Sequence, residues 1–532
     1  MKNKFFNAQH GKQEVTLNSQ DKKPGFLSRR NFFKLIGGTG VAGAAAITAG
    51  CSKAPAGGTG WLPQQYHTAS HWPVQVKGRV PIDISNPSIA RDDRKCILCG
   101  QCIEVCKNTQ TVFGYYDLPL KNDIICTHCG QCAMWCPTAA ITERDDVNKV
   151  VKALDDKNTF VVVQTAPATR IALGEEFGLS LGSNVEGRQV AALKKLGFDA
   201  VFDTGFTADL TIMEEASELI KRLKEKTTLP QFTSCCPGWV KFCEYYYPDF
   251  IPHLSTAKSP QQMLGTLTKT YYAEIKGINP NNIISVAIMP CTAKKFEAQR
   301  PEMATNRNLR DVDIVLTTRE IARLIKMRGL DITTLEEAQY DNLLGESSGA
   351  GMIFAATGGV TEAAVRTAHY LATNEPPPEP LLSFTAVRGL KGVKEASIEI
   401  PGLGHLNVAV CHGLKNARII LDKLRSGEAS WDFIEVMACD GGCIGGGGQP
   451  RTALPPSDKV RTSRIAGIYN IDKKDRTRLS YENEEIQLVY KNFLVRPLSD
   501  IAEELLHTHY SDRSEHLITK KNYSLNEGDS NS

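Results

Sequence analysis

The chain has 532 residues, 42% of them hydrophobic and 23% charged, which is the composition of an ordinary globular protein with room for several domains. Its 62 basic and 59 acidic residues leave a formal net charge of only +3, so no excess of charge argues for a nucleic-acid partner. The unusual number is 16 cysteines, eight of which lie between Cys96 and Cys136. Cysteine spacing is therefore the most informative pattern in the sequence.

The N-terminus predicts an export signal. Ser28-Arg29-Arg30-Asn31-Phe32-Phe33-Lys34 precedes a Gly- and Ala-rich run, and residues 1–50 resemble a twin-arginine signal peptide, a route that passes proteins already folded around their cofactors. The run is too short and too glycine-rich for a membrane-spanning helix. Thr48-Ala49-Gly50-Cys51 also matches a degenerate lipoprotein box with Cys51 acylated, but ordinary cleavage after the Ala-rich stretch or after Ala56 explains the same residues.

The signal predicts that the twin-arginine translocase delivers the protein to the periplasm or to the outer face of the cytoplasmic membrane, with lipid anchoring at Cys51 as one option. Residues 51–88 are rich in Pro, Gly and His and are predicted to be a linker. The final residues, 513–532, are predicted to be a disordered tail.

Two cysteine runs lie in residues 89–148. Each has the spacing C-x2-C-x2-C-x3-C, which is typical of a bacterial ferredoxin-like α+β domain with two 4Fe-4S clusters, where the fourth cysteine of each run ligates the other run's cluster. The predicted ligand sets are Cys96, Cys99, Cys102 and Cys136 for one cluster, and Cys126, Cys129, Cys132 and Cys106 for the other. A zinc or disulfide interpretation is weaker, because zinc sites have no use for a doubled, interlocked spacing.

From about residue 150 the pattern changes to short apolar runs separated by helical periodicity. This predicts an α/β domain at residues 149–450 with mostly parallel sheets. The predicted strands are Phe160–Val163, Ile283–Met289, Val312–Leu316 and Phe433–Ala438. In such sheets, sites gather beyond the carboxyl ends of the strands, which is where the later cysteines fall.

A helix predicted at 211–226 leads into Thr233-Ser234-Cys235-Cys236-Pro237-Gly238-Trp239. Its flank carries Glu215 and Glu218, three residues apart, a place where most carboxylates are simply solvated. Adjacent side chains point in different directions, so one thiol of the Cys235-Cys236 pair can face a buried inorganic centre while the other faces a second cavity. The alternative is a pair of small buried hydrophobes, as free cysteines often are.

Three motifs carry the chemistry. They are Thr233-Ser234-Cys235-Cys236-Pro237, Met289-Pro290-Cys291-Thr292-Ala293-Lys294-Lys295-Phe296-Glu297, and Glu435-Val436-Met437-Ala438-Cys439-Asp440-Gly441-Gly442-Cys443. Spacing alone places four thiolates at strand ends, enough for one more cubane: Cys236, Cys291, Cys439 and Cys443. Together the motifs resemble the three signature motifs of the iron-iron (FeFe) hydrogenases, and the likeness extends over about residues 90–510.

The resemblance implies two lobes around an H-cluster, whose 4Fe-4S cubane is held by those four cysteines. It also implies that Cys443 bridges the cubane to a two-iron unit. The ligands of that unit are carbon monoxide, cyanide and a bridging dithiolate that carries an amine. Lys294 would pair with a cyanide nitrogen, and Glu297 would orient or balance its surroundings. The residues implied to line the same pocket are Met289, Met437, Ala166 and Pro167.

The remaining thiol, Cys235, matches the family's proton-shuttling cysteine. Carried over residue by residue, the relay continues through Glu215, Ser255 and Glu218, all of which are present. The resemblance thereby turns two ordinary helix-flank carboxylates into predicted proton carriers.

Residues 451–512 resemble the segment that a separate small subunit supplies in some periplasmic relatives. Asp500 to Glu503 is predicted to form a capping box. We expect His507 and His509 to be structural rather than metal ligands, because no further ligands cluster near them in the sequence.

The sequence thus predicts an exported hydrogenase that catalyses the reversible conversion of dihydrogen into two protons and two electrons, with uptake as the favoured direction. The predicted partners are a cytochrome, ferredoxin or membrane-bound electron carrier and the hydrogenase maturation proteins. One alternative is a hydrogenase-like iron-sulfur assembly or scaffold protein, against which the intact Lys294, Glu297 and Cys235 argue. The other is a hydrogen-sensing hydrogenase, a class that often alters the relay and appends signalling domains.

Overall fold

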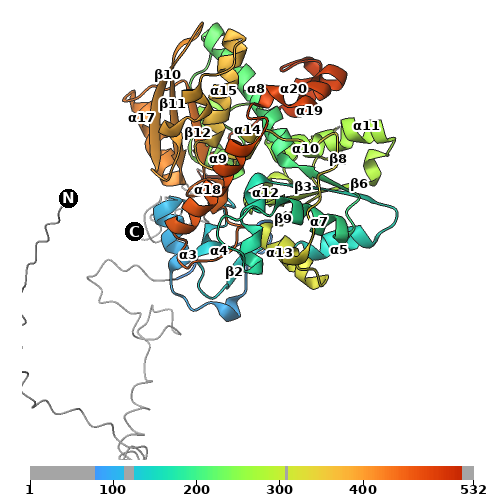
Figure 1. Cartoon of the computed structure of the whole chain (residues 1–532). Helices are drawn as coiled ribbons and strands as arrows, with labels where there is room; N and C mark the ends of the chain where they lie inside the picture. The colour runs from blue at the N-terminus through green and yellow to red at the C-terminus, as the bar shows by residue number, and fades with distance from the viewer. Residues whose placement is uncertain (1–77, 113–124, 306–308, 518–532) are drawn as a thin grey trace, which may run out of the picture. The chain divides into compact units, whose positions relative to one another are not determined.

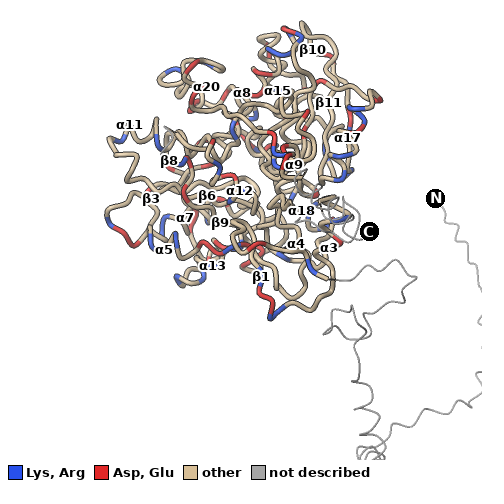
Figure 2. Tube along the Cα trace, turned by 180° about the vertical axis from the view of Figure 1, so that it is seen from behind, with Lys and Arg blue, Asp and Glu red and all other residues tan. Residues whose placement is uncertain are grey.

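The computed structural model describes residues 78–112, 125–305 and 309–517. The predicted signal peptide and Cys51 lie outside the described residues, as do most of the predicted linker and tail. None of the described helices is long and apolar enough to cross a bilayer. Basic and acidic residues are interspersed along the described trace (Figure 2).

The segment with the two cysteine runs is built from short elements. Strands β1 (Ile89–Arg91) and β2 (Ile141–Glu143) pair antiparallel, with Ile89 opposite Glu143. Between them lie the helices α3 (Gln101–Glu104) and α4 (Gln131–Trp135). Each helix begins after a glycine with positive φ, Gly100 at 76° and Gly130 at 70°, a conformation that glycine adopts without a steric penalty.

The first large sheet has the order β4-β3-β6-β9 and is wholly parallel. Its strands are β3 (Phe160–Thr165), β4 (Ala200–Asp203), β6 (Ile283–Met289) and β9 (Ile314–Thr317). Alternate β3 residues face opposite sides: Val161 and Val163 pack with α5 (Val147–Asp155), α7 (Glu186–Leu196) and α13 (Thr318–Met327). Val162 faces α10 (Pro260–Leu267). Helices therefore cover both faces, as parallel sheets require.

The second large sheet has the order β10-β11-β12-β5. Its strands are β5 (Gln231–Phe232), β10 (Val393–Ile400), β11 (Gly404–His412) and β12 (Phe433–Met437). Only β10 and β11 pair antiparallel; β11, β12 and β5 are parallel. One face packs on α9 (Pro237–Tyr246) and α17 (Leu414–Ser426), and the other on α14 (Gly349–Ile353) and α15 (Gly359–Thr373).

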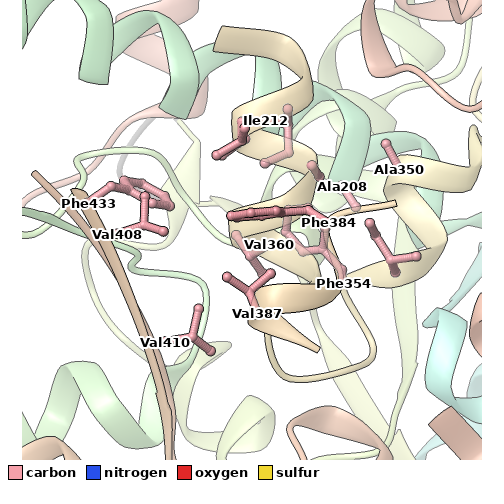
Figure 3. Close-up of a cluster of buried hydrophobic side chains, with 14 of the residues drawn as sticks. Ala208, Ile212, Ala350, Phe354, Val360, Phe384, Val387, Val408, Val410 and Phe433 are labelled. Carbon is pink, nitrogen blue, oxygen red and sulfur yellow. The ribbon is translucent and has the colours of Figure 1, made fainter. Parts of the chain in front are cut away.

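Helix α8 (Thr204–Glu225) joins the two halves, because it contributes to the cores of both (Figure 1). Ala208 and Ile212 belong to the same buried hydrophobic cluster as Val408, Val410 and Phe433 of the second sheet (Figure 3). Phe206 and Leu210 pack with the first sheet. The helix begins seven residues before the predicted start at Thr211, with Asp203 as its N-cap. The α/β prediction with mostly parallel sheets is confirmed for this part of the chain.

Several further helices complete the packing. The short helices are α6 (Pro167–Arg170), α11 (Ala273–Lys276), α12 (Ala293–Glu297) and α16 (Glu379–Leu382). The C-terminal helices are α18 (Asp458–Lys474), α19 (Glu484–Val489) and α20 (Asp500–Leu506). The capping-box prediction is wrong: Ser499 is the N-cap of α20, and its side chain accepts a hydrogen bond from the Ala502 N–H, but alanine at this third position cannot return one to the cap. The remaining strands, β7 (Ala304–Thr305) and β8 (Leu309–Arg310), form a small antiparallel pair.

Candidate active site

A cavity of about 80 Å³ lies where strands of both large sheets end, and we call it the central cavity. Its walls come mainly from residues at or just after the ends of β3, β5, β6 and β12, with further residues from α8 and from the end of α14. They include Ala166, Pro167, Cys235, Cys236, Met289, Cys291, Lys294, Met437 and Cys443. The structure thus brings together most of the side chains predicted for the active site, at the carboxyl ends of parallel strands.

Four cysteines interact electrostatically at this cavity. Cys236, Cys291 and Cys443 line it, while Cys439 lies within electrostatic reach of Cys236 and Cys291. Burial raises the pKa of every one of these thiols, that of Cys443 to about 12. Four neighbouring thiols with raised pKa values ionise together only beside a strongly positive group, so the donor set fits an iron-sulfur cubane. The Ala438 N–H also donates to the Cys236 sulfur at 3.4 Å, the kind of contact that stabilises a ligating sulfur.

The two N-terminal cysteine runs interlock in the predicted way. Cys96, Cys99, Cys102 and Cys136 line a cavity of about 20 Å³, which we call the outer cluster cavity. Cys126, Cys129, Cys132 and Cys106 line a cavity of about 30 Å³, the inner cluster cavity. In the part of the chain that the structure describes, no three His, Cys, Asp or Glu side chains converge on a single metal ion. In a cubane site each cysteine binds a different iron atom, so the four sulfurs need not lie within reach of one metal ion.

The inner cluster cavity adjoins the central cavity. Cys129 is among the electrostatic neighbours of Cys439, and the Gln131 side chain donates to the Gly445 carbonyl at 2.9 Å. Gly447 packs so closely that a Cβ added there would lie 2.2 Å from the Cys129 carbonyl oxygen. Cys132 is in turn an electrostatic neighbour of Cys102 in the outer set. The three cysteine groups therefore form a series, outer to inner to central.

Lys294 is the cation of the central cavity. Its Nζ donates to the Cys235 carbonyl at 3.0 Å and to Glu297 Oε2 at 2.9 Å. Burial opposes the charge on Lys294, but Glu297 outweighs it and raises the Lys294 pKa. Glu297 lies behind the lysine, where Ser259 and Gln261 also donate to Oε2. Ser259 and Gln261 were not predicted, and only their place before and within a helix could have drawn attention to them.

Cys235 is buried beside the four ligand-type cysteines without belonging to them. Burial and the nearby Glu215 raise the pKa of its thiol. Glu215 is 1% exposed, and among the described residues neither of its carboxyl oxygens has a hydrogen-bond partner of ordinary geometry. Burial, with the charge of Glu218, raises the Glu215 pKa to about 8, while Ser255 and the Ser234 backbone oppose that shift. Glu215 can therefore both hold and release a proton near neutral pH.

Ser255 and Glu218 continue from Glu215 towards solvent. Ser255 Oγ donates to Glu218 Oε2 at 2.8 Å, and Arg222 donates to Glu218 Oε1 at 2.7 Å. The Glu218 and Arg222 side chains are 10% and 12% exposed, so the line reaches the surface there. The sequence prediction missed Arg222, although its spacing of four from Glu218 on one helix face was a usable signal.

The fold and these cysteine-lined cavities define an iron-sulfur oxidoreductase. Residues 159–447 match the family described as iron only hydrogenase large subunit, C-terminal domain, and residues 458–513 match iron hydrogenase small subunit. The chain belongs to the iron-only hydrogenase family and is an iron-iron hydrogenase.

Known relatives agree with this assignment. The chain is 47% identical to the NADP-reducing hydrogenase subunit HndD of Solidesulfovibrio fructosivorans, over 81% of this chain and 76% of that protein. It is 46% identical to the periplasmic Fe hydrogenase large subunit of Nitratidesulfovibrio vulgaris, over 71% and 90% respectively. A solved structure of the apo FeFe hydrogenase of Chlamydomonas reinhardtii superimposes with a TM-score of 0.61 at 43% identity, covering 69% of this chain and 99% of that one. A cytosolic Fe-S cluster assembly factor of Xenopus tropicalis is more distant, at 31% identity over 75% of this chain and 84% of that protein.

Proposed function

We propose that this enzyme converts dihydrogen reversibly into two protons and two electrons at the central cavity, and that in its own setting it consumes dihydrogen. The observation that carries the proposal is the line Cys235, Glu215, Ser255, Glu218 and Arg222, which leads from a cavity walled by thiols to the surface. A buried redox centre that exchanges protons needs such a route. A protein that only stores or transfers iron-sulfur clusters does not.

The residues around the central cavity are suited to an H-cluster. Cys236, Cys291, Cys439 and Cys443 would hold its 4Fe-4S part. When bound, the two-iron unit supplies the heterolytic cleavage of dihydrogen. Lys294 would pair with an anionic cyanide ligand, which suits a buried ammonium held by Glu297. The apolar wall, which keeps water out, would come from Ala166, Pro167, Met289 and Met437.

In the uptake direction, the Cys235 thiol gives its S–H proton to the carboxylate form of Glu215 and takes up a new proton at Sγ from the central cavity. A carboxyl with a pKa of about 8 accepts this proton and gives it up again without a large barrier in either direction. Ser255, which lies near enough to Glu215 to lower its pKa, donates to Glu218, and Arg222 holds Glu218 where the line meets solvent. The inner and the outer cluster cavity would each hold one 4Fe-4S cluster, and these clusters would supply the path for electrons away from the central cavity.

We further propose the division 1–50 signal peptide, 51–88 linker, 89–148 ferredoxin-like domain, 149–450 catalytic domain, 451–512 small-subunit-like segment and 513–532 tail. Arg29-Arg30 supports export by the twin-arginine translocase to the periplasm or the outer face of the cytoplasmic membrane, with Cys51 as a candidate lipid anchor. A cytochrome, ferredoxin or membrane-bound carrier would take the electrons, and hydrogenase maturation proteins would install the H-cluster.

The experiment is expression with the maturation machinery, followed by measurement of dihydrogen-dependent reduction of a viologen dye. The preparation must show the infrared bands of carbon monoxide and cyanide, which report the two-iron unit. We expect turnover in the parent protein, and its loss in Cys235→Ala with the bands retained. A fully loaded parent that neither consumes nor produces dihydrogen would contradict the proposal and favour the assembly-factor alternative.

A further inference from the structure

The segment that follows α20 pairs with the residues next to Ser255. The Lys258 N–H donates to the Leu506 carbonyl at 2.7 Å, and the Thr508 N–H donates to the Thr256 carbonyl at 2.8 Å. Between these two hydrogen bonds His507 lies opposite Ala257 in an antiparallel bridge. The small-subunit-like part of the chain therefore contacts the backbone that carries a member of the proton line.

The imidazole of His507 is held on both sides. Its Nδ1 lies 2.7 Å from Thr256 Oγ1, and its Nε2 lies 3.1 Å from Glu214 Oε2. Glu214 is fully buried, and it also accepts hydrogen bonds from the Tyr490 hydroxyl at 2.5 Å and from the Leu498 N–H at 2.8 Å. His507 thus joins an anchored carboxylate of α8 to the side chain of Thr256.

Thr256 holds the proton line with its backbone. Its N–H donates to Glu218 Oε2 at 3.1 Å, the same oxygen that accepts from Ser255 Oγ at 2.8 Å. The Ala257 N–H donates to Ser255 Oγ at 3.2 Å, which fixes the rotamer of that hydroxyl. Residues 255–257 therefore set the geometry of both Ser255 and Glu218, and His507 holds the same three residues from the outside.

We propose that His507 is a positioning residue of the proton line: through Thr256 it keeps Ser255 and Glu218 at the separation that proton transfer requires. This inference rests on the proposed function. His507 belongs to the C-terminal segment, so that segment takes part in turnover and does not merely cover the catalytic domain. A metal-ligand role fits less well, because Glu214 is the sole carboxylate among the described residues that hydrogen-bonds to the imidazole.

Paired substitutions separate the two contacts of the ring. His507→Asn keeps a polar atom at the Nδ1 position, facing Thr256, whereas His507→Gln keeps one at the Nε2 position, facing Glu214. His509→Ala is the matched control, because His509 is exposed and lies two residues away on the same segment. Thr256→Val removes the Oγ1 contact from the other side with little change of shape.

Each variant is matured, and its two-iron unit is quantified by infrared bands. Dihydrogen uptake, D2/H+ exchange and the solvent deuterium isotope effect on turnover are then measured. We expect His507→Gln and Thr256→Val to lose uptake and exchange roughly 10- to 100-fold, because small misplacements in a transfer line have effects of that order. Their isotope effect should rise as proton transfer becomes limiting. His507→Asn should stay within about twofold of the parent, and His509→Ala should match it.

The inference is overturned if His507→Gln and Thr256→Val turn over at the parent rate, or if His507→Asn is as impaired as His507→Gln. It is also overturned if lost rate follows lost infrared bands with an unchanged isotope effect, since the role would then be structural. A parent protein that contains the two-iron unit but shows no turnover is a different result, because it contradicts the proposed function itself.

Discussion

Glu215→Gln tests the proton line at its most buried member. Glutamine has the shape of a protonated glutamate but cannot release a proton. With a pKa of about 8, some nine in ten Glu215 side chains carry a proton at pH 7, and half do at pH 8. We expect the variant to keep its two-iron unit and to lose turnover by about 10²- to 10⁴-fold, the range typical of a lost proton-transfer group. That corresponds to roughly 3 to 5 kcal/mol of barrier.

The same substitution should stabilise the protein. The pKa of Glu215 rises from 4.5 in the unfolded chain to about 8 in the folded protein, so the folded protein holds a proton that the unfolded chain releases. Stability therefore falls as pH rises from 4.5 towards 8, by about 5 kcal/mol in total. Between pH 6 and pH 9 the parent should lose about 3 kcal/mol that Glu215→Gln does not lose.

The assays are viologen reduction under dihydrogen and urea unfolding at the two pH values. Glu225→Gln is the control, because Glu225 is exposed at the end of the same helix. A variant that is slower and more stable than the parent supports the reasoning. A variant with parental turnover refutes the relay, and one with parental pH dependence of unfolding refutes the buried, protonated carboxyl.

Three other substitutions give sharp outcomes. Gly447→Ala would place a Cβ too close to the Cys129 carbonyl oxygen, so the backbone of the inner cluster cavity must shift. We expect viologen reduction by this variant to fall about tenfold. Its D2/H+ exchange should be kept, because exchange needs no electron transfer. Arg319→Met leaves the buried Glu143 with Arg323, at 2.6 Å, as its remaining arginine partner, and should cost about 1.5 to 3 kcal/mol in urea unfolding at pH 7. Lys294→Met removes a charged hydrogen-bond donor from the central cavity, and we expect the infrared bands of the two-iron unit to weaken about 10- to 100-fold while the cubane signals in electron paramagnetic resonance persist.

Local patterns predicted the elements that have one apolar face or end at a distinctive motif. Ile283–Met289 is a strand with the predicted bounds, and Phe433–Ala438 is shortened by one residue. The first turns of α8 escaped prediction because residues 204–210 are buried against both sheets, which leaves no polar face to reveal a helical period. Ser499, and not Asp500, is the N-cap of α20; serine and aspartate both suit an N-cap position, and tertiary packing decides between them.

The residues of the site also divide into those that a local sequence pattern could reveal and those that it could not. Cysteine spacing and motif resemblance located the thiols, Lys294 and the two glutamates of α8, because each motif is contiguous in the chain. The contact between His507 and Glu214 joins residues 293 positions apart, and no local period encodes it. Glu214 is adjacent to a predicted relay residue, yet its burial and its C-terminal partners become visible only in three dimensions.

The C-terminal segment is part of the same chain as the catalytic domain, and this affects how the enzyme's activity depends on protein concentration. The pairing of residues 506–508 with residues 256–258 is intramolecular, so its effective concentration is set by the connecting chain, roughly in the millimolar range for a short tether. Two separate chains would release this contact as the protein is diluted below their dissociation constant. In this enzyme the specific activity per molecule should therefore be independent of concentration, down to the lowest that an assay can reach.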